Sequence, residues 1–439
     1  MTYTVAGRPL VGRLVVGVWI VLAAGLYVTF QELPLVADVS LLPLELSTDW
    51  DAGVNTRTFY VATEAAFAGE DIYAVYPEDA SEFYTYLYPP ITVLGFAPLL
   101  LVSQSTALVG LSVLSAIACL AAGWLVVRYV EPAADPLGWI DVAALGTFFF
   151  VSGHSLWTVY YGNINLLLLL LFAVGFVALE ADRGLVSGAA FSVAALFKLF
   201  PAVVGLYFLR RRAWTAVGTA LAIGIGGIAV GAILFGIDTS RQYFFEVLPD
   251  RTDSEAFVGG YDPAEFYYVT IQRPLSHVLW EVWPSAPADV LPVVSALVVL
   301  PVLLVFYVDV TTRFDRVIAM FATIVAMLVV MPSMLQYMVL LYAPLFSLLY
   351  LWGDRPGWLA FVAGAVLFLP VERPSSVVDT LSVLPSPLFD VLAPLAAVAS
   401  IQLWGMALML GACAWYKFGP TTWTVRTALE RLQPGSTGS

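Results

Sequence analysis

Two carboxylates near the start of the chain could carry out acid–base chemistry. The sequence Asp49-Trp50-Asp51 follows a first apolar stretch and lies in a polar segment. A carboxylate whose pKa is tuned by burial can act as a general base on a hydroxyl group. We therefore expect Asp51, with Asp49 as the second choice, to be the catalytic residue; a pair of solvated acidic side chains is the alternative. No cofactor is required for this chemistry, and a divalent metal ion, which the acidic segment could hold, is not indicated by any ligand pattern.

Lys198 is the second residue that could do chemistry. It lies inside an apolar stretch, three residues before Pro201, and no Asp or Glu lies within a helical turn of it. A charged side chain at the centre of a bilayer costs about 2.5–3.5 kcal/mol on insertion scales, so it needs a partner. Lysine commonly binds phosphate as a point charge. The sequence leaves two partners open, an anionic lipid phosphate and a carboxylate from another helix.

Further polar residues border the apolar segments. Asn163 and Asn165 precede a run of leucines, where they could bind the hydroxyls of a ligand or cap a helix, with Asn163 as the N-cap. Arg273 could bind a phosphate and His277 a substrate hydroxyl, and a surface ion pair is the alternative for this pair. Tyr88 precedes two prolines that lead into an apolar segment, a position typical of interfacial tyrosines.

The composition tells us which kind of element must position these residues. Of the 439 residues, 60% are hydrophobic and 12% are charged, and the mean hydropathy is +0.88. Soluble proteins contain about 45–50% apolar and about 25% charged residues. The composition therefore predicts an all-α polytopic membrane protein. The net charge of −13 argues against a nucleic-acid partner, because phosphate backbones repel acidic proteins.

The charge is concentrated in two segments. Residues 31–90 contain eleven Asp or Glu and one Arg, and residues 237–289 contain nine and three. Residues 55–68 within the first segment predict an amphipathic helix that ends at Gly69. The chain has 17 Arg but only two Lys, and an acidic surface poor in Lys is typical of proteins from very salty surroundings. A haloarchaeal source is therefore expected.

Apolar segments of about 20 residues predict about 10–12 transmembrane helices. Because Arg and Lys favour cytosolic loops, Arg8, Arg13 and Lys417 place both termini in the cytosol and both acidic loops outside. The expected organisation is a cytosolic N-terminus with a first transmembrane helix (1–30), an extracellular acidic loop with an amphipathic helix (31–90), a transmembrane core (91–236), a second extracellular loop (237–289), C-terminal transmembrane helices (290–416) and a cytosolic tail (417–439).

Two stretches do not fit this alternation. Arg183 and Arg210–Arg212 should both be cytosolic, yet a single apolar stretch separates them. Because Pro201 interrupts helical hydrogen bonding, a re-entrant hairpin with Lys198 near its tip would resolve the conflict; a single span is the alternative. Residues 90–135 are ambiguous as well, because two crossings there would put Arg128 outside.

Four segments, in this order, resemble glycosyltransferase family 87. They are FYVATEAAFAGEDIY (59–73), YLYPPITVLGFAPL (86–99), GNINLLLLLL (162–171) and AALFKLFPAVVGLYFLRRR (194–212). The resemblance covers roughly residues 45–215. It implies a GT-C membrane fold and the transfer of a hexose, typically mannose, from a polyprenyl or dolichyl phosphate sugar at the outer face of the cell membrane. The acceptor would be a glycan, a glycoprotein or a glycolipid, and membrane lipids would be the other partners.

The resemblance also implies roles for single residues. Tyr60, Gly69 and Tyr73 match the family pattern of the first loop, Gly162, Asn163 and Asn165 match its Gly-Gln/Asn-x-Asn element, and Lys198 and Pro201 match its Lys-x-x-Pro element. The family aspartate usually lies a few residues before the tyrosine, where this chain has Asn55, so Asp51 is displaced from that position. The later Ser-Pro…His-His element appears here as MPSMLQY (331–337), in which Gln336 is the candidate.

Taken together, the expected reaction is an inverting hexosyl transfer. Asp51 would deprotonate the acceptor hydroxyl, and Lys198 and Arg273 would stabilise the leaving phosphate. The expected binding residues are Lys198, Arg273, Asn163, Asn165, Tyr60, Tyr88, His277 and Gln336. A secondary transporter or lipid flippase is the alternative, although transporters usually pair broken helices in two repeated halves and no second Lys-x-x-Pro follows. A non-catalytic assembly subunit is a third reading.

Overall fold

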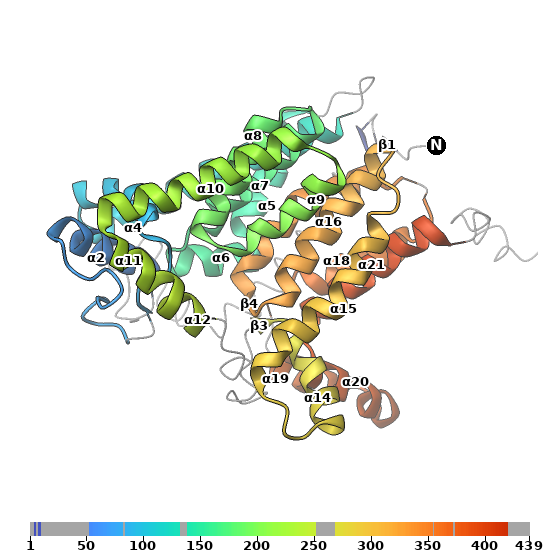
Figure 1. The fold of residues 1–439 in the computed structure, drawn as a ribbon. Helices are drawn as coiled ribbons and strands as arrows, with labels where there is room; N and C mark the ends of the chain where they lie inside the picture. Colours follow the sequence, from blue (N-terminus) through green and yellow to red (C-terminus); the bar gives the residue numbers. More distant parts are fainter. Residues whose placement is uncertain are drawn as a thin grey trace, which may run out of the picture.

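The computed structural model describes residues 4–5, 8–9, 52–81, 84–131, 138–251, 268–353, 355–371 and 374–419. These residues form helices almost throughout (Figure 1), and their strands are limited to two short antiparallel pairs. β1 (Thr4–Val5) pairs with β2 (Arg8–Pro9), and β3 (Tyr268–Val269) pairs with β4 (Ser333–Met334). The expected all-α class is confirmed.

α2 (Val54–Ala68) is the amphipathic helix that the sequence predicts over residues 55–68. It ends at Gly69, whose φ of 78° lets its N–H reach the carbonyls of Ala65 and Ala66. Three short helices follow the acidic loop: η3 (Pro90–Thr92), α3 (Val93–Phe96) and η4 (Ala97–Leu101). α3 and η4 pack against α2. Residues 90–101 therefore form a folded support for α2.

α4 (Gln104–Val130) resolves the ambiguous stretch 90–135. It is one helix of 27 residues, long enough to cross a membrane, and it begins where the side chain of Ser103 accepts a hydrogen bond from the N–H of Thr106. Near its other end the hydroxyl of Tyr129 donates to Glu180. Glu180 also binds arginines from two other segments, so α4 carries Arg128 to the end of the bundle where the basic residues lie.

The next three helices pack around α4. They are α5 (Trp139–Val151), α6 (Gly153–Tyr160) and α7 (Asn165–Glu180), and α5 and α6 meet at an angle of 56°. α4 and α5 touch at Gly123 and Gly146, where a Cβ atom on Gly123 would lie 2.8 Å from the backbone nitrogen of Gly146. Glycine is therefore required at this crossing, because any side chain would separate the two backbones.

The stretch that contains Lys198 forms a helical hairpin. Its limbs are α8 (Gly184–Phe197) and the continuous pair η5 (Phe200–Val203) and α9 (Val204–Arg210). Glu180 precedes the first limb and Arg211 follows the second, and their side chains form an ion pair of 2.6 Å. Both ends of the hairpin therefore lie together, and the chain turns back at Lys198. The hairpin alternative of the sequence is confirmed.

α10 (Trp214–Phe235) supports the first limb along its length, as Figure 1 shows. A Cβ atom on Gly184 would lie 2.9 Å from the side chain of Thr215, and one on Gly227 would lie 2.8 Å from that of Leu196. The start of α8 thus lies against the start of α10, and the end of α8 against the later part of α10, so the two helices run parallel. This geometry is possible only because the return limb of the hairpin lies between them in sequence.

The rest of the chain surrounds α16 (Arg313–Val330), which is buried along nearly its whole length. The other elements are α11 (Ile237–Gln242), η6 (Tyr243–Val247), α12 (Leu248–Arg251), α14 (Gln272–Val282), η8 (Ala288–Val290), α15 (Leu291–Phe306), η9 (Leu335–Leu341), α17 (Tyr342–Leu351), α18 (Trp358–Phe368), α19 (Pro374–Leu381), α20 (Ser386–Val398) and α21 (Ile401–Phe418). α14, α19 and α20 project from one end of the bundle (Figure 1).

Three helical segments of the described chain are long and apolar enough to cross a membrane on their own. They are α4, α10 and residues 288–306, and the bent pairs α5–α6 and α20–α21 raise the number to five. Six shorter apolar helices of 10–17 residues lie beside them. The architecture is that of an all-α polytopic membrane protein. In the described residues, helices long enough to cross a membrane are fewer than the apolar segments. One reason is that the two apolar limbs of the hairpin enter and leave the bundle at the same end.

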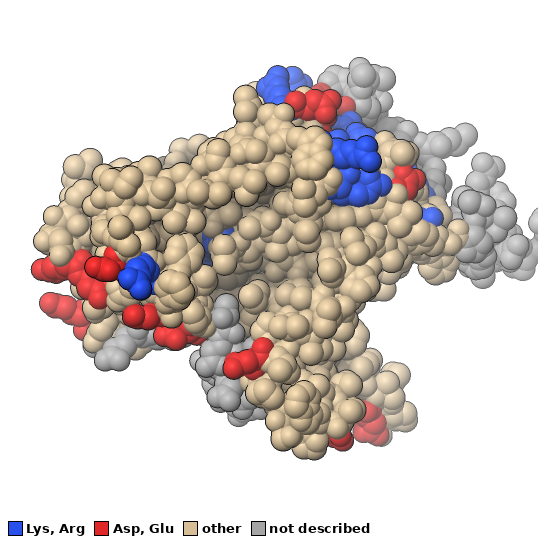
Figure 2. Space-filling model, viewed as in Figure 1, with Lys and Arg blue, Asp and Glu red and all other residues tan. Residues whose placement is uncertain are grey.

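Acidic side chains predominate at one end of the bundle and basic side chains at the other, as Figure 2 shows. The acidic side chains of residues 64–79, 238–250 and 281–289 lie at the end that carries α2, α11 and α14. Most basic side chains lie at the other end, around the end of α9 and the start of α16. We call these the acidic end and the basic end.

Candidate active site

Lys198 lies at the tip of the hairpin, at the point where α8 stops. Its backbone is extended (φ −146°, ψ 118°), and Pro201 in the following turn lacks the N–H that a continuous helix would need. The side chain is only 6% exposed, and its Nζ lies 3.5 Å from the centre of the Tyr337 ring. The face of an aromatic ring attracts a cation, by about 2 kcal/mol or more where water is excluded. The structure thus holds a buried ammonium group against the face of one aromatic ring.

η9 places Gln336 next to Asn165, the first residue of α7. The backbone carbonyl of Gln336 accepts hydrogen bonds from the Nδ2 of Asn165 and the Oγ1 of Thr158, each at 3.3 Å. Within the described residues, neither the Oδ1 of Asn165 nor the Oε1 of Gln336 has a hydrogen-bond partner, although both side chains are buried. An unsatisfied buried polar group costs about 1–3 kcal/mol. Two hydroxyl groups of a ligand could satisfy these two oxygens.

A series of packed aromatic rings connects Lys198 with the first acidic segment and α2. Phe197, the residue before Lys198, contacts the rings of Tyr88 and Phe96 edge-on, with centroids 6.4 and 5.6 Å away. Phe96 stacks on Phe59 of α2 at 4.2 Å. Tyr60 follows Phe59 on α2 and is half-buried. Because Tyr88 and the tip of the hairpin touch, the structure brings the YLYPP and Lys-x-x-Pro elements together.

A second tyrosine, Tyr73, holds the backbone of Tyr88 in place. The hydroxyl of Tyr73 donates a hydrogen bond of 2.9 Å to the backbone carbonyl of Tyr88. Burial raises the pKa of Tyr73 far above its usual value, and the neighbouring Tyr86 and Tyr243 add to the shift. The phenol therefore stays neutral and keeps its proton for this hydrogen bond at any physiological pH.

Asp49 and Asp51, the expected catalytic residues, lie outside the described residues. The backbone that follows them is fixed by three hydrogen bonds: Gly53 N–H to Tyr160 O (2.7 Å), Asn55 N–H to Tyr161 O (2.9 Å) and Thr56 Oγ1 to Gly162 O (2.9 Å). This attachment places the start of α2 beside the loop between α6 and α7. That loop leads to Asn165, which donates a hydrogen bond to the carbonyl of Gln336. The loop therefore contacts both the segment after Asp51 and Gln336.

Asn163 does not have the expected position. α7 begins at Asn165 and its N-cap is Ile164, so the expectation that Asn163 is the N-cap is wrong by one residue. The side-chain oxygen of Asn163 instead accepts a hydrogen bond from the N–H of Ile164 at 2.8 Å. The cause is Gly162, whose φ of 65° turns the backbone before the helix starts.

Arg273 and His277 lie one helical turn apart on α14, but only Arg273 is buried. Arg273 is buried and donates a hydrogen bond of 3.1 Å to the carbonyl of Ala397. Its neighbour Gln272 donates to the carbonyl of Val330, next to the β3–β4 pair that leads to Gln336. His277 is on the exposed face. The structure therefore gathers Tyr88, Asn165, Lys198 and Gln336, keeps Arg273 at the same end of the bundle, and leaves His277 facing outwards.

Tyr337 is the residue of this site that the sequence did not single out. It lies in the MPSMLQY segment beside Gln336, packs against Phe200 at 5.6 Å and forms the ring under the Lys198 amine. Because the contact joins two distant segments, local spacing could not reveal it. No cluster of three or more His, Cys, Asp or Glu side chains that could hold a metal ion lies in the part of the chain that the structure describes.

Comparison with known proteins places this geometry in a family. The model of glycosyltransferase family 87 matches residues 86–332, more than half of the chain. The match begins at Tyr86, near the end of the first acidic segment, and extends beyond residue 215, where the resemblance seen in the sequence ends. It includes Tyr88, Asn165, Lys198 and Arg273 but stops before Gln336.

One similar protein is the polyprenol-phosphate-mannose-dependent alpha-(1-2)-phosphatidylinositol pentamannoside mannosyltransferase of Mycolicibacterium smegmatis. The two sequences are 31% identical over 178 residues, which make up 40% of this chain and 42% of that relative. The family match favours the transferase over the transporter and flippase that the sequence left open. By the extent of that match, the chain belongs to glycosyltransferase family 87.

Proposed function

We propose that the protein transfers a hexose, mannose, from a polyprenyl or dolichyl phosphate sugar to a glycan or lipid acceptor on the outer face of the membrane, with inversion at the anomeric carbon. The family match and the donor of the M. smegmatis relative, polyprenol phosphate mannose, support the donor class. The observation that carries the proposal is the buried ammonium of Lys198 at the tip of the hairpin, over the ring of Tyr337, the residue next to Gln336.

The leaving group is the polyprenyl phosphate. Lys198 would pair with its charge, which grows as the bond between the anomeric carbon and the phosphate oxygen breaks. A preorganised charge in a site without water is usually the largest contribution to such catalysis. The amide oxygens of Asn165 and Gln336 would accept hydrogen bonds from sugar hydroxyls and so orient the ring. Arg273, at the same end of the bundle, would add positive charge.

The acceptor hydroxyl needs a base. Asp51, or Asp49, would take its proton while the hydroxyl oxygen attacks the anomeric carbon from the face opposite the phosphate, which inverts the configuration. The three hydrogen bonds just after Asp51, two between backbone groups and one from the side chain of Thr56, support this role, because they fix the segment next to the α6–α7 loop that leads to Asn165. Precise positioning of this kind accounts for a large part of enzymatic rate enhancement.

The separation of charge supports the proposed orientation. Arg and Lys are enriched in cytosolic loops, and the basic end of the bundle includes Arg128, Arg183, Arg313 and Lys417. We place that end and both termini in the cytosol, and the acidic end, which carries α2, at the outer face, with the hairpin tip and Lys198 directed towards that face. A lipid-linked sugar donor would then reach Lys198 from the outer leaflet.

A transfer assay tests the proposal. The purified protein in liposomes is incubated with radiolabelled dolichyl phosphate mannose or dolichyl phosphate glucose and with a membrane extract as the acceptor source. Wild type should transfer mannose, and Asp51→Asn should transfer none. Asp79→Asn is the matched control, because Asp79 is an acidic residue of the same loop that is half exposed and pairs with Arg57. Transfer by Asp51→Asn at the wild-type rate would refute the role of Asp51 as base.

A further inference from the structure

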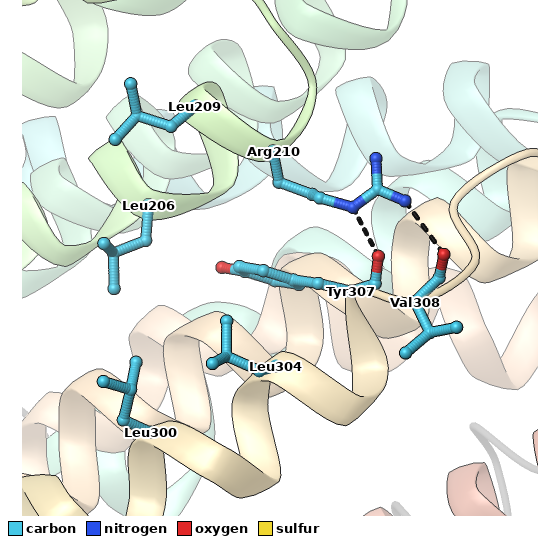
Figure 3. Close-up of a pocket in the computed structure, with 7 residues that line it drawn as sticks. All are labelled: Leu206, Leu209, Arg210, Leu300, Leu304, Tyr307 and Val308. Atoms are coloured by element: carbon cyan, nitrogen blue, oxygen red, sulfur yellow. Dashed lines mark hydrogen bonds between the residues drawn. The ribbon is translucent and has the colours of Figure 1, made fainter.

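A groove runs along the membrane-facing surface between α9 and α15. Its cavity volume is about 410 Å³, and it is lined by Leu206, Leu209, Arg210, Leu300, Leu304, Tyr307 and Val308. Figure 3 shows Leu206 of α9 facing Leu300 and Leu304 of α15 across the space. The four leucines are 41–53% exposed, so the groove is an apolar surface that other parts of the described chain do not cover. An apolar groove of this kind in a membrane protein is shaped for a hydrocarbon chain.

One end of the groove is polar because Arg210 closes it. The Nε of Arg210 donates to the carbonyl of Tyr307, and its Nη2 donates to that of Val308 at 2.9 Å. Figure 3 shows the third guanidinium nitrogen pointing away from both carbonyls. The groove therefore joins a hydrocarbon surface to an arginine with one donor group directed outwards, which is the chemistry of an anionic amphiphile.

The surroundings of Arg210 carry a surplus of positive charge. Arg211 and Arg316 share the buried Glu180, and Lys417 pairs with Asp315 and lies near Asp309. Basic residues predominate around the end of α9 and the start of α16, where Arg210, Arg211, Arg212, Arg313, Arg316 and Lys417 lie with the acidic Glu180, Asp309 and Asp315. Arg212 is exposed next to Arg210. Figure 2 shows this basic surface at the same end.

We propose that the groove binds one anionic phospholipid from the leaflet at the basic end. One of its chains would lie between Leu206 and Leu304, and its phosphate would contact Arg210 and Arg212. Basic pockets between transmembrane helices recognise anionic headgroups in this way. The sugar donor does not fit here, because its phosphate is placed at Lys198, at the opposite end of the limb formed by η5 and α9. The bound lipid would join that limb to α15.

Lipid binding can be measured without the transfer reaction. The delipidated protein is titrated with phosphatidylglycerol or with phosphatidylcholine of the same chains, and bound lipid is counted by native mass spectrometry. Wild type should bind phosphatidylglycerol more tightly. Arg212→Gln should reduce that preference about fivefold, since an arginine near a lipid surface contributes about 1 kcal/mol. Arg128→Gln, which changes an exposed arginine at the same end, should have no effect.

A second variant removes the groove and leaves the arginines in place. Leu304→Trp should fill the groove and abolish binding of the tight phosphatidylglycerol molecule. The side chain of Leu304 is 53% exposed, so the change should be tolerated by the fold. Val302→Trp is the control, because Val302 is 47% exposed and points away from the groove on the same helix. Retained binding by Leu304→Trp, equal affinity for both lipids in wild type, or displacement of the lipid by dolichyl phosphate would each overturn the proposal.

Discussion

At the scale of single residues, Gly162 controls the geometry of the candidate site. Its φ of 65° turns the chain between α6 and α7, and its carbonyl accepts a hydrogen bond from Thr56. A Cβ atom at this position would lie 2.2 Å from the Oγ1 of Thr56. The residue therefore fixes both the start of α7, where Asn165 lies, and the start of α2, which follows Asp51.

Gly162→Ala tests this role against a matched control. Gly69→Ala also places a side chain at a positive φ of 78°, but its Cβ would meet nothing within 4 Å. The strain of a positive φ alone costs about 1–3 kcal/mol, so Gly69→Ala should lower the Tm slightly and keep activity. Gly162→Ala should also displace Thr56 and lower kcat at least tenfold. Equal kcat values for the two variants would contradict a positioning role for Gly162.

The residue pattern predicts Lys198, whereas it does not predict the roles of Tyr337 and Asn163. The sequence identifies Lys198 because a charge in an apolar stretch stands out locally. It does not identify Tyr337, which is one aromatic residue among many and meets Lys198 only in the folded chain. Asn163 looks like an N-cap, but the left-handed turn at Gly162 moves the start of the helix to Asn165. Backbone turns of this kind depend on tertiary contacts, here with Thr56.

At the scale of elements, the hairpin α8–η5–α9 is the main positioning device. It carries Lys198 into the apolar body from the basic end, and Glu180 ties its two ends to α16 through Arg211 and Arg316. The sequence predicts the hairpin as one of two alternatives, because Arg183 and Arg210–Arg212 compete for one side and Pro201 lies between them. It could not decide between the alternatives, because the Glu180 contacts that close the hairpin are tertiary.

Removing the Glu180 carboxylate should loosen the hairpin. Breaking a buried ion pair by deleting one partner costs about 3–5 kcal/mol. We expect less for Glu180→Gln, about 1–3 kcal/mol, because Arg211 and Arg316 are 17% and 22% exposed and stay partly hydrated. The Tm in detergent should fall measurably, whereas Glu131→Gln, which breaks a pair with the exposed Arg128, should change it little. Equal Tm changes for both variants would remove Glu180 from this role.

At the scale of the whole molecule, the sequence predicts the class and the distribution of charge better than the number of crossings. Composition alone predicts the all-α membrane architecture, and the described parts of the two acidic segments lie at one end of the bundle as expected (Figure 2). The apolar segments overcount complete spans, because residues 90–101 break into short helices against α2 and residues 184–210 turn back. Hydropathy indicates that a segment lies in an apolar environment, but it does not show that the segment crosses the membrane. Both segments are apolar, yet their helices are too short to span a membrane individually.

The orientation can be tested by labelling single cysteines with a membrane-impermeant maleimide. Cys119 and Cys413 are buried, so they should not react in the folded protein. Asp79→Cys, at the acidic end, should be labelled in intact cells. Arg183→Cys and Arg212→Cys, at the two ends of the hairpin, should both be labelled only after the membrane is permeabilised. Labelling of either hairpin variant in intact cells would contradict the cytosolic placement of the basic end.

The central claim is that the ammonium at the tip of the hairpin holds the phosphate of the lipid donor, and the affinity for dolichyl phosphate measures it most directly. A hydrogen bond to a charged group contributes about 1.5–3 kcal/mol, so Lys198→Met should weaken binding by about 10- to 100-fold. Lys198→Arg should recover part of the loss, and both variants should keep a Tm close to that of the wild type. A Lys198→Met variant that binds dolichyl phosphate as tightly as the wild type would contradict the account.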